Sequence, residues 1–264
     1  MSDEIFSRHR RRLNRARAQR AAADSHWLLD RMAQELVDRL AFMTLDVAQV
    51  LVIGHGAAVV RPALPAAAEL TNCDLAAGPG IDVVADEDRL PFGDARFDLV
   101  VACGTLDSID DLPGALILIR RALRPGGLFL GAMLGAGSLS GLRQLVHQAE
   151  AATAPQSALR FHPQIEVRAA GDLLIRAGFS TPVADQEDIA AHYGAFATLR
   201  QDVRATGAGL ALKTVYPMAR ATYQAIQQAA QDAPLAENFA PIYMTGWAPV
   251  AGEARPAGPV KGFL

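Results

Sequence analysis

Gly54-His55-Gly56 is the first group of residues in this chain whose spacing could serve chemistry. It follows a short apolar run over 47–53 and lies where a strand would turn into a helix. Glycines at such a turn let the backbone approach a ligand, and the first amides of a helix attract polar or anionic groups. Tight turns also use glycine for purely conformational reasons, so the pair alone indicates a ligand site only weakly.

Two carboxylates follow other apolar runs. Asp74 ends the run over 70–74, and Asp107 comes shortly after the run over 97–103. Asp74 could bind a ligand at the sheet edge or form a turn. Asp107 could serve as a general base or could cap the helix that begins near Asp110. We expect the cap and keep the base as the alternative.

The residues that usually carry metal or oxygen chemistry form no known pattern. None of the six histidines belongs to an H-x-D or H-x-E pair, so a standard non-haem iron triad is absent. Cys73 and Cys103 each end a predicted strand, which favours reduced thiols in the cytosol. Two cysteines also argue against zinc, and we predict no metal site. The polar aromatic residues available to shape a substrate cleft are His162, Tyr193, Tyr216, Tyr243 and Trp247.

An α/β fold would position these groups. From Ile81 to Met133 the sequence is typical of strand, acidic turn, strand, helix, glycine turn and strand, in that order. The run over 97–103 is almost continuously apolar, as in a strand covered on both faces, and 115–123 has the apolar spacing of a covering helix that Pro125-Gly126-Gly127 would stop. We predict five strands in this core, at 47–53, 70–74, 82–85, 97–103 and 128–133.

Helices surround this core in the prediction. Two precede it, at 5–20 and at 25–43, the second capped by Asp24 or Ser25. Further elements are helices at 138–152 and 167–177, ended by Gly178, an edge strand at 183–189, helices at 195–206 and 215–230, and a last strand at 242–247. The expected organisation is a helical extension over 1–45, one domain over 46–250 with a helical cover over 138–230, and an irregular tail over 251–264.

Two segments depart from a regular α/β unit. Pro62 and Pro65 interrupt the first helix, so it should be short or begin near Pro62. The connection from Asp74 to Ile81 is too short for a crossover helix, which takes about a dozen residues or more. We expect an irregular third strand or a missing helix there.

Composition and charge restrict the function classes. With 51% hydrophobic residues and a mean hydropathy of +0.14, the 264 residues can bury a large core. A net charge of -3 gives no reason to expect nucleic acid as a partner, and no apolar stretch is long enough for a membrane span or a secretory signal. We expect a mature cytoplasmic protein. One segment is rich in arginine, at positions 8, 10, 11, 12, 15, 17 and 20. Three interpretations stay open: a solvated helix, a binding surface for an acidic partner protein, or a substrate lid.

Short sequence motifs in the core resemble those of a known family. VVADEDRLPF, FDLVV, DDLPGAL, LRPGG and LFLGAM are similar to class I S-adenosylmethionine (SAM) dependent methyltransferases. GAMLGAGSLSGLRQLVHQAE, RAGF and PIYMTGW resemble more closely the methyltransferase-like assembly factors of respiratory complex I, and more distantly the malonyl carrier-protein methyltransferases of biotin synthesis. The resemblance implies a Rossmann-like, mostly parallel seven-stranded sheet with an antiparallel last strand. For the mitochondrial assembly factor it also implies hydroxylation of an arginine on a complex I subunit.

The resemblance also implies a SAM site at the carboxyl ends of the central strands. Glycines approach the methionine part, one acid accepts from both ribose hydroxyls, a second acid faces the adenine amino group, and a wall residue faces the methyl donor. The matching residues here are, in that order, Gly54 and Gly56, then Asp74, then Asp86 with its neighbour Glu87, and Cys103.

The first glycine motif departs from the family pattern. Val52 stands where the family has an acid, and Ala58 stands where it has a third glycine. We therefore predict a modified SAM site, with loss of binding as the alternative. The function expected is methyl transfer to a protein or small-molecule acceptor; the alternative is an idle or hydroxylase-type factor that assists complex I assembly. A dinucleotide oxidoreductase ranks third because the third glycine is missing.

Overall fold

A seven-stranded sheet forms the centre of the computed structural model, which describes residues 4–154, 158–232 and 234–250. The strand order is β3-β2-β1-β4-β5-β9-β6, and β9 runs antiparallel to both β5 and β6 while β1 to β5 are parallel. This confirms the predicted sheet with its reversed last strand. The strands are β1 Gln49–Gly54, β2 Glu69–Asp74, β3 Val83–Val84, β4 Phe97–Cys103, β5 Leu123–Leu134, β6 Ser180–Gln186 and β9 Pro241–Trp247.

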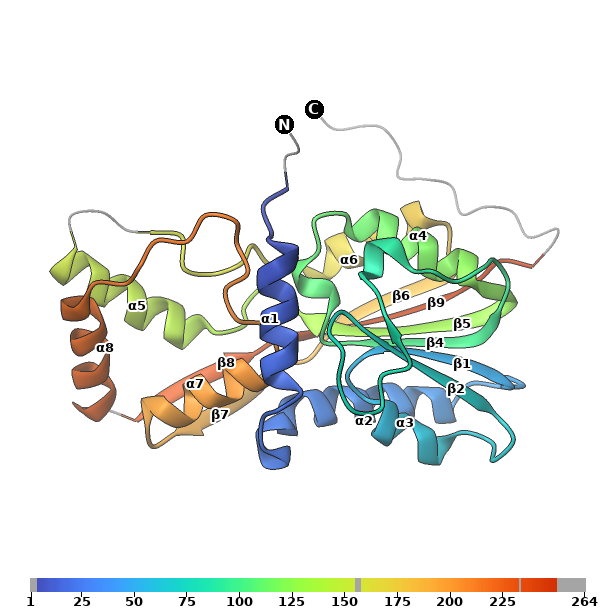
Figure 1. Cartoon of the computed structure of the whole chain (residues 1–264), viewed down its shortest axis with the longest axis horizontal. Helices are drawn as coiled ribbons and strands as arrows, with labels where there is room; N and C mark the ends of the chain where they lie inside the picture. The colour runs from blue at the N-terminus through green and yellow to red at the C-terminus, as the bar shows by residue number, and fades with distance from the viewer. Residues whose placement is uncertain (1–3, 155–157, 233, 251–264) are drawn as a thin grey trace.

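Helices cover both faces of this sheet (Figure 1). On one face lie α2 (Trp27–Ala41) and α3 (Ala57–Val60), and on the other lie α4 (Leu112–Ala122) and α6 (Val167–Ala177). Successive residues of β4 alternate between the two cores, because Leu99 and Val101 pack with α2 whereas Val100 packs with α4. The run over 97–103 is therefore apolar throughout, as a strand buried on both sides must be.

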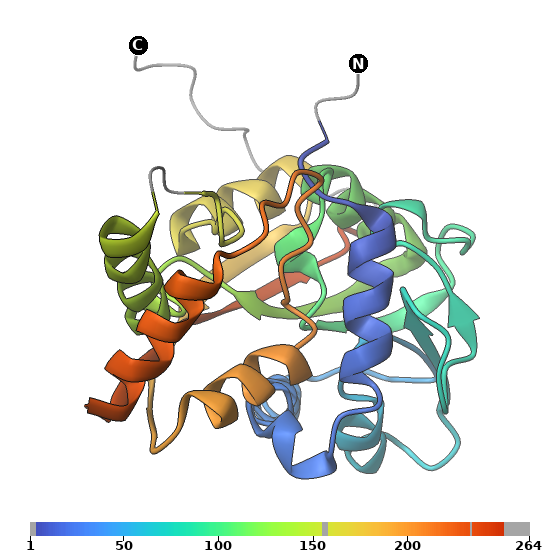
Figure 2. The same ribbon diagram turned by 60° about the vertical axis from the view of Figure 1, so that its left-hand side comes forward.

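A helical cover stands beside the sheet. It comprises α5 (Ser140–Thr153), α7 (Phe196–Ala205) and α8 (Arg220–Asp232), with a hairpin of β7 (Ile189–Tyr193) and β8 (Leu235–Phe239) (Figures 1 and 2). Val146, Ala149 and Ile226 form a small core between α5 and α8. The sequence prediction missed this hairpin, and it placed the edge strand β6 about three residues too late.

The first helix, α1 (Arg8–Ala18), crosses the carboxyl ends of the strands and lies beside α7 (Figures 1 and 2). Ser7 caps it by accepting a hydrogen bond from the Arg10 amide at 3.3 Å. The segment before it is fixed because the Ile5 and Phe6 amides both donate to Asp110. The predicted cap of α2 is wrong: a 3-10 turn, Ala23–His26, leads into that helix, and no side chain caps it.

Both predicted irregularities are confirmed. The helix after β1 has only four residues and continues as a 3-10 turn, Arg61–Ala63, where Pro62 removes a backbone donor. No helix lies between β2 and β3, and β3 pairs through only two residues. The predicted helix stop at Pro125 is wrong, because α4 already ends at Ala122 and Pro125-Gly126-Gly127 belongs to β5. Gly178 ends α6 in the left-handed conformation, as predicted. The predicted tail over 251–264 lies outside the described residues.

Asp98 anchors the start of β1 to β4. Its carboxylate accepts hydrogen bonds from the Ala48 and Gln49 amides at 2.9 and 2.8 Å and pairs with Arg124 at 2.6 Å. Burial pushes the pKa of Asp98 upward, but these three partners outweigh burial and hold it below its usual value. The charged form is therefore stabilised by folding.

We expect Asp98→Asn to lower the free energy of unfolding by about 1 kcal/mol at neutral pH, because the Ala48 and Gln49 amides lose a charged acceptor. A group with a depressed pKa contributes stability above its unfolded pKa and loses it as the pH falls through its folded pKa. The difference from wild type should thus shrink below about pH 4. Urea unfolding across pH measures it, with the exposed Asp94→Asn as control. An equal loss at every pH would contradict this role.

Candidate functional site

The glycine loop packs against the end of β4. Gly54 and Gly56 have φ of 85° and 115°, which favours glycine at both positions. A Cβ on Gly54 would collide with Thr105 and with the Cys103 carbonyl. His55, between them, donates its amide to the same carbonyl and holds Asp30 of α2 through Nε2 at 2.6 Å. Burial lowers the pKa of His55, in spite of Asp30, so the ring favours its neutral form.

A cavity of about 260 Å³ opens at this loop, and we call it the glycine-loop cavity. Gly54 and Gly56 line it together with Asp74, which ends the neighbouring strand β2. The structure thus brings these three predicted site residues together. Asp86, Glu87 and Cys103 do not line it. Residues that the sequence analysis missed complete its walls, among them Arg15, Gln19, His26, Asp30 and Asn72.

Asp74 is buried and paired. Its side chain is 1% exposed, and Arg15 of α1 reaches it with Nη2 at 2.6 Å from Oδ2 and with Nε at 3.3 Å from Oδ1. The Ala76 amide donates to Oδ1 at 3.1 Å. Burial opposes the charge of Arg15, but Asp74 outweighs burial and raises the pKa of Arg15 above its ordinary value. Arg15 therefore stays charged on the carboxylate.

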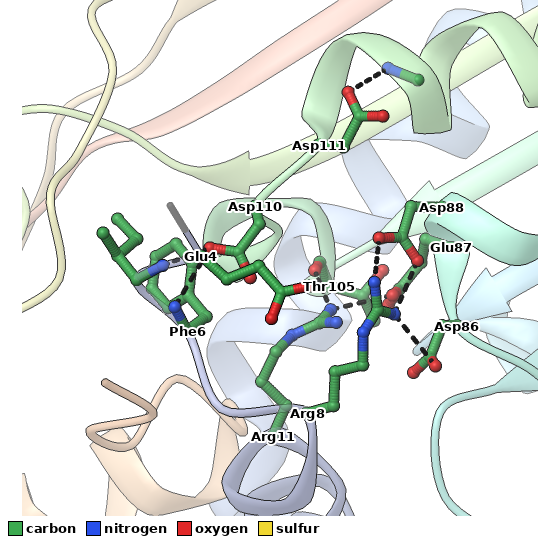
Figure 3. A network of polar contacts seen from close by, with 12 residues as sticks. Glu4, Phe6, Arg8, Arg11, Asp86, Glu87, Asp88, Thr105, Asp110 and Asp111 are labelled. Carbon is green, nitrogen blue, oxygen red and sulfur yellow. Dashed lines mark hydrogen bonds and ion pairs between the residues drawn. The ribbon is translucent and has the colours of Figure 1, made fainter. Parts of the chain in front are cut away.

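Three more carboxylates follow β3 and meet the same helix (Figure 3). Arg11 holds Glu87 at 2.8 Å, Arg12 holds Asp86 at 3.1 Å, and Arg8 contacts Asp86 at 3.0 Å and Asp88 at 2.5 Å. We call residues 8, 11, 12 and 15 the arginine row; their spacing places them on one face of α1. We call residues 74, 86, 87 and 88 the carboxylate row. Arg8, through its hydrogen bond, lowers the pKa of Asp88.

These pairs bear on the three expectations for the arginine-rich segment. Four of its seven arginines hold carboxylates of the same chain, so a purely solvated helix is wrong for that face. Arg11 and Arg15 are each 5% exposed. A grip on an acidic partner through them would first have to break internal pairs. α1 lies across the carboxyl edge, and its role as a substrate lid stays a prediction.

A second cavity, of about 330 Å³, lies under the helical cover, and we call it the apolar cavity. Side chains of α5, α7 and α8 line it, including Leu142, Val146, Val203 and Ile226. His162, which the sequence analysis proposed for a cleft, also lines it, accepts the Ala211 amide at 2.7 Å, and has its pKa lowered to about 4 by burial. The other polar side chains on its wall are Asp107, Arg143, Arg160, Gln164, Arg200 and Tyr223.

Asp107 lines the apolar cavity and does not cap α4. It lies in a 3-10 turn, Leu106–Ser108, and the cap of α4 is Asp111, which accepts from the Gly114 amide at 2.8 Å (Figure 3). The preferred prediction for Asp107 is therefore wrong. Burial raises the pKa of Asp107 to about 6, with Arg11 acting in the opposite direction. A carboxyl with this pKa can exchange a proton near neutral pH.

Comparison with known proteins places the fold in a family. Residues 51–131 match the family described as methyltransferase domain. Malonyl-[acyl-carrier protein] O-methyltransferase of Laribacter hongkongensis is 30% identical over 94% of this chain and 91% of its own length. The chain belongs to the class I SAM-dependent methyltransferase superfamily.

Three further similarities concern only part of a relative or the fold alone. Human mitochondrial arginine-hydroxylase NDUFAF5 is 33% identical over 68% of this methyltransferase-fold chain, but the match spans only 54% of NDUFAF5. Among solved structures, the YcgJ protein of Bacillus subtilis gives a TM-score of 0.52 at 16% identity over 82% of this chain and 98% of its own. The [4+2]-cyclase SpnF gives 0.50 at 18% identity over 84% and 81%. These two structures show the fold alone.

The methyltransferase-fold edge offers groups that suit an adenosyl ligand. Asn72 Oδ1, Asp86 Oδ1 and Glu87 Oε1 are buried acceptors without a hydrogen-bond partner among the described residues. An adenosyl group brings donors, namely two ribose hydroxyls and an adenine amino group. Buried acceptors normally have partners, and Asn72, which lines the glycine-loop cavity, fits a hydroxyl or amino donor of SAM there. Within the described ranges, no cluster of three or more histidine, cysteine or acidic side chains could hold a metal ion.

Both thiols of this methyltransferase-fold chain are inaccessible. Cys73 and Cys103 are 0% exposed, and burial raises the pKa of each to about 12. We expect neither to react with a thiol-specific disulfide reagent at pH 8 in the native protein, because the thiolate and its access are both missing. Both should react after denaturation. Native labelling of Cys103 would show that the edge of β4 is open to solvent.

Proposed function

We propose that this chain is a SAM-dependent methyltransferase that acts on a protein or small-molecule acceptor. The observation that supports it best is the glycine-loop cavity, where Gly54, Gly56 and Asp74 meet at the carboxyl edge of parallel strands. Open α/β folds bind nucleosides at this edge, and an acid at the end of the second strand suits ribose hydroxyls. When bound there, SAM supplies a methyl group activated by its sulfonium.

Each predicted residue has a place in this proposal. The loop at Gly54 and Gly56 would hold the methionine part, and Asp74 would accept from the ribose. Asp86 and Glu87 each have a buried oxygen without a hydrogen-bond partner among the described residues, but neither lines the glycine-loop cavity, so their contact with adenine stays a prediction. Cys103 is buried, so it can only support the loop from behind. Val52 and Ala58, at the two departures from the family motif, leave the loop with fewer polar groups for the cofactor.

We expect calorimetry to detect binding of SAM and of its demethylated product to the wild-type protein. Asp74→Asn should weaken both by about 10–100-fold, because a hydrogen bond to a charged group contributes about 1.5–3 kcal/mol. The exposed Asp24→Asn serves as the matched control and should bind like wild type. The absence of heat with either ligand would count decisively against a cofactor site.

We assign the acceptor to the apolar cavity. Its walls come from the cover helices and from Leu134 at the carboxyl end of β5, so it adjoins the edge where the cofactor would lie. Asp107 on its wall could accept a proton from the acceptor. Methyl transfer otherwise needs mainly alignment, which a closely fitting cavity provides. Malonyl carrier protein, named for the Laribacter relative, is the first acceptor to assay.

If Asp107 is the base, it must be deprotonated to act. The rate at limiting acceptor should then fall as the pH drops below about 6, where the carboxylate takes up its proton. Asp107→Asn should lower turnover by about 10²–10⁴-fold and remove this pH dependence. The rate of product formation, measured across pH, tests this prediction. Asp111→Asn is the control, because asparagine still caps α4. An unchanged pH profile in Asp107→Asn would exclude the base.

The second candidate is an idle or hydroxylase-type factor that assists assembly of a respiratory complex. It rests on the likeness to NDUFAF5 and on Arg15, which occupies the carboxylate that the ribose would need. Under this proposal the protein subunit is a partner, and cofactor binding is weak or lost. Reversing the charges of Arg10, Arg11 and Arg12 tests whether these arginines contact the partner. Arg11 and Arg12 also pair with carboxylates of the same chain. A pull-down left intact by the reversal would exclude these arginines from the contact.

We keep a cytoplasmic location as part of the first proposal. No helix among the described residues is long and apolar enough to cross a membrane. Fractionation of cells that express the full chain tests the location.

A further inference from the structure

We propose that Arg15 sets the cofactor affinity of this site by competing with the ribose for Asp74. The inference rests on the proposed SAM site and adds a residue that determines how tightly it binds. Arg15 lines the glycine-loop cavity from α1, opposite the sheet edge that carries Gly54 and Asp74. A nucleoside that enters the cavity meets this guanidinium on the carboxylate it needs.

Arg15 and a ribose diol cannot bind the Asp74 carboxylate at the same time. Arg15 uses both carboxylate oxygens, Nη2 on Oδ2 at 2.6 Å and Nε on Oδ1 at 3.3 Å. The Ala76 amide takes a further position on Oδ1. A ribose diol also needs both oxygens, on the side that faces the cavity. Binding of the ribose to Asp74 therefore requires Arg15 to leave.

Arg15 has a second acceptor within reach. Its Nη1 lies 3.5 Å from the Thr206 carbonyl at the end of α7. Both groups are buried, so an arginine that left Asp74 without any partner would carry a large desolvation cost. The Thr206 carbonyl lowers that cost, and the displaced side chain can remain beside the cavity.

The rest of the arginine row keeps α1 in place during this exchange. Arg11 donates to Glu87, to the Thr105 carbonyl and to Ser108, all buried groups (Figure 3). Gln19, one turn after Arg15, donates to the Ala76 carbonyl at 3.1 Å. These contacts flank Arg15 on both sides along the helix. The exchange is therefore a movement of one side chain, which a substitution at position 15 isolates.

Calorimetric titration with the demethylated product of SAM tests the competition in a series of full-length variants. Arg15→Met keeps the apolar length of the side chain and removes its charge. It should bind at least about tenfold tighter than wild type, because the ligand no longer breaks a charge-assisted pair. Arg15→Lys keeps the charge without the forked geometry and should fall between the two. Arg17→Met, an exposed position on the same helix, should match wild type.

The outcomes separate this inference from the proposed function. Binding by wild type that is unchanged or weaker in Arg15→Met overturns the competition alone; weaker binding would mean that Arg15 helps to hold the cofactor. Binding by Arg15→Met but not by wild type supports the competition and contradicts cofactor binding by the native chain. Absence of binding in every variant overturns both. Thermal unfolding identifies a variant that fails to fold, and Arg15→Lys then carries the comparison, because it retains a cation beside Asp74.

Discussion

Four carboxylates at one edge of the sheet require counter-charges, and the rest of the site follows from how the chain supplies them. Asp74, Asp86, Glu87 and Asp88 are each less than a tenth exposed. Buried charges of one sign are too costly to persist without partners. Helix α1 supplies the counter-charges, because the arginine row lies on one face of this helix. The helix that precedes the sheet in sequence is thus held across its carboxyl edge.

This arrangement explains why the site has two chemically different cavities. The arginine row belongs to α1, which contacts α7 of the cover, and Arg15 lines the glycine-loop cavity of about 260 Å³. The apolar cavity lies among α5, α7 and α8, and its wall combines many apolar side chains with the charged groups of Asp107, Arg143, Arg160 and Arg200. Under the proposed function, the cofactor and the acceptor would occupy two cavities of different polarity that share no lining residue. The same arrangement is compatible with a catalytically idle protein, because the arginines of α1 already pair with the carboxylates at this edge.

The weakened glycine motif has a structural counterpart. Gly54 is required by its contact with the end of β4, whatever the ligand, and Val52 is a core residue packed against α2. The loop has therefore kept the residues that the fold needs. His55 and Asp30 form a pair at its rim that joins the loop to α2. The missing crossover helix after β2 leaves that side of the cavity to α1 and its Gln19.

The sequence by itself determined the central sheet and the order of its strands, but it missed the β7–β8 hairpin and misplaced the ends of β5 and β6. The sheet could be predicted because burial on both faces makes a central strand such as β4 apolar throughout, and because Gly178 and Pro62 act on the backbone locally. It also placed Gly54, Gly56 and Asp74 near one another, since neighbouring parallel strands end at the same edge. Only the tertiary structure decided that Arg15 covers Asp74 and that Asp107 lines a cavity. Arg15 and Asp74 lie 59 positions apart, and no local pattern encodes which distant charge a buried carboxylate will meet. The cap of α4 by Asp111 is a local contact, three positions long, that the sequence analysis assigned to the wrong aspartate.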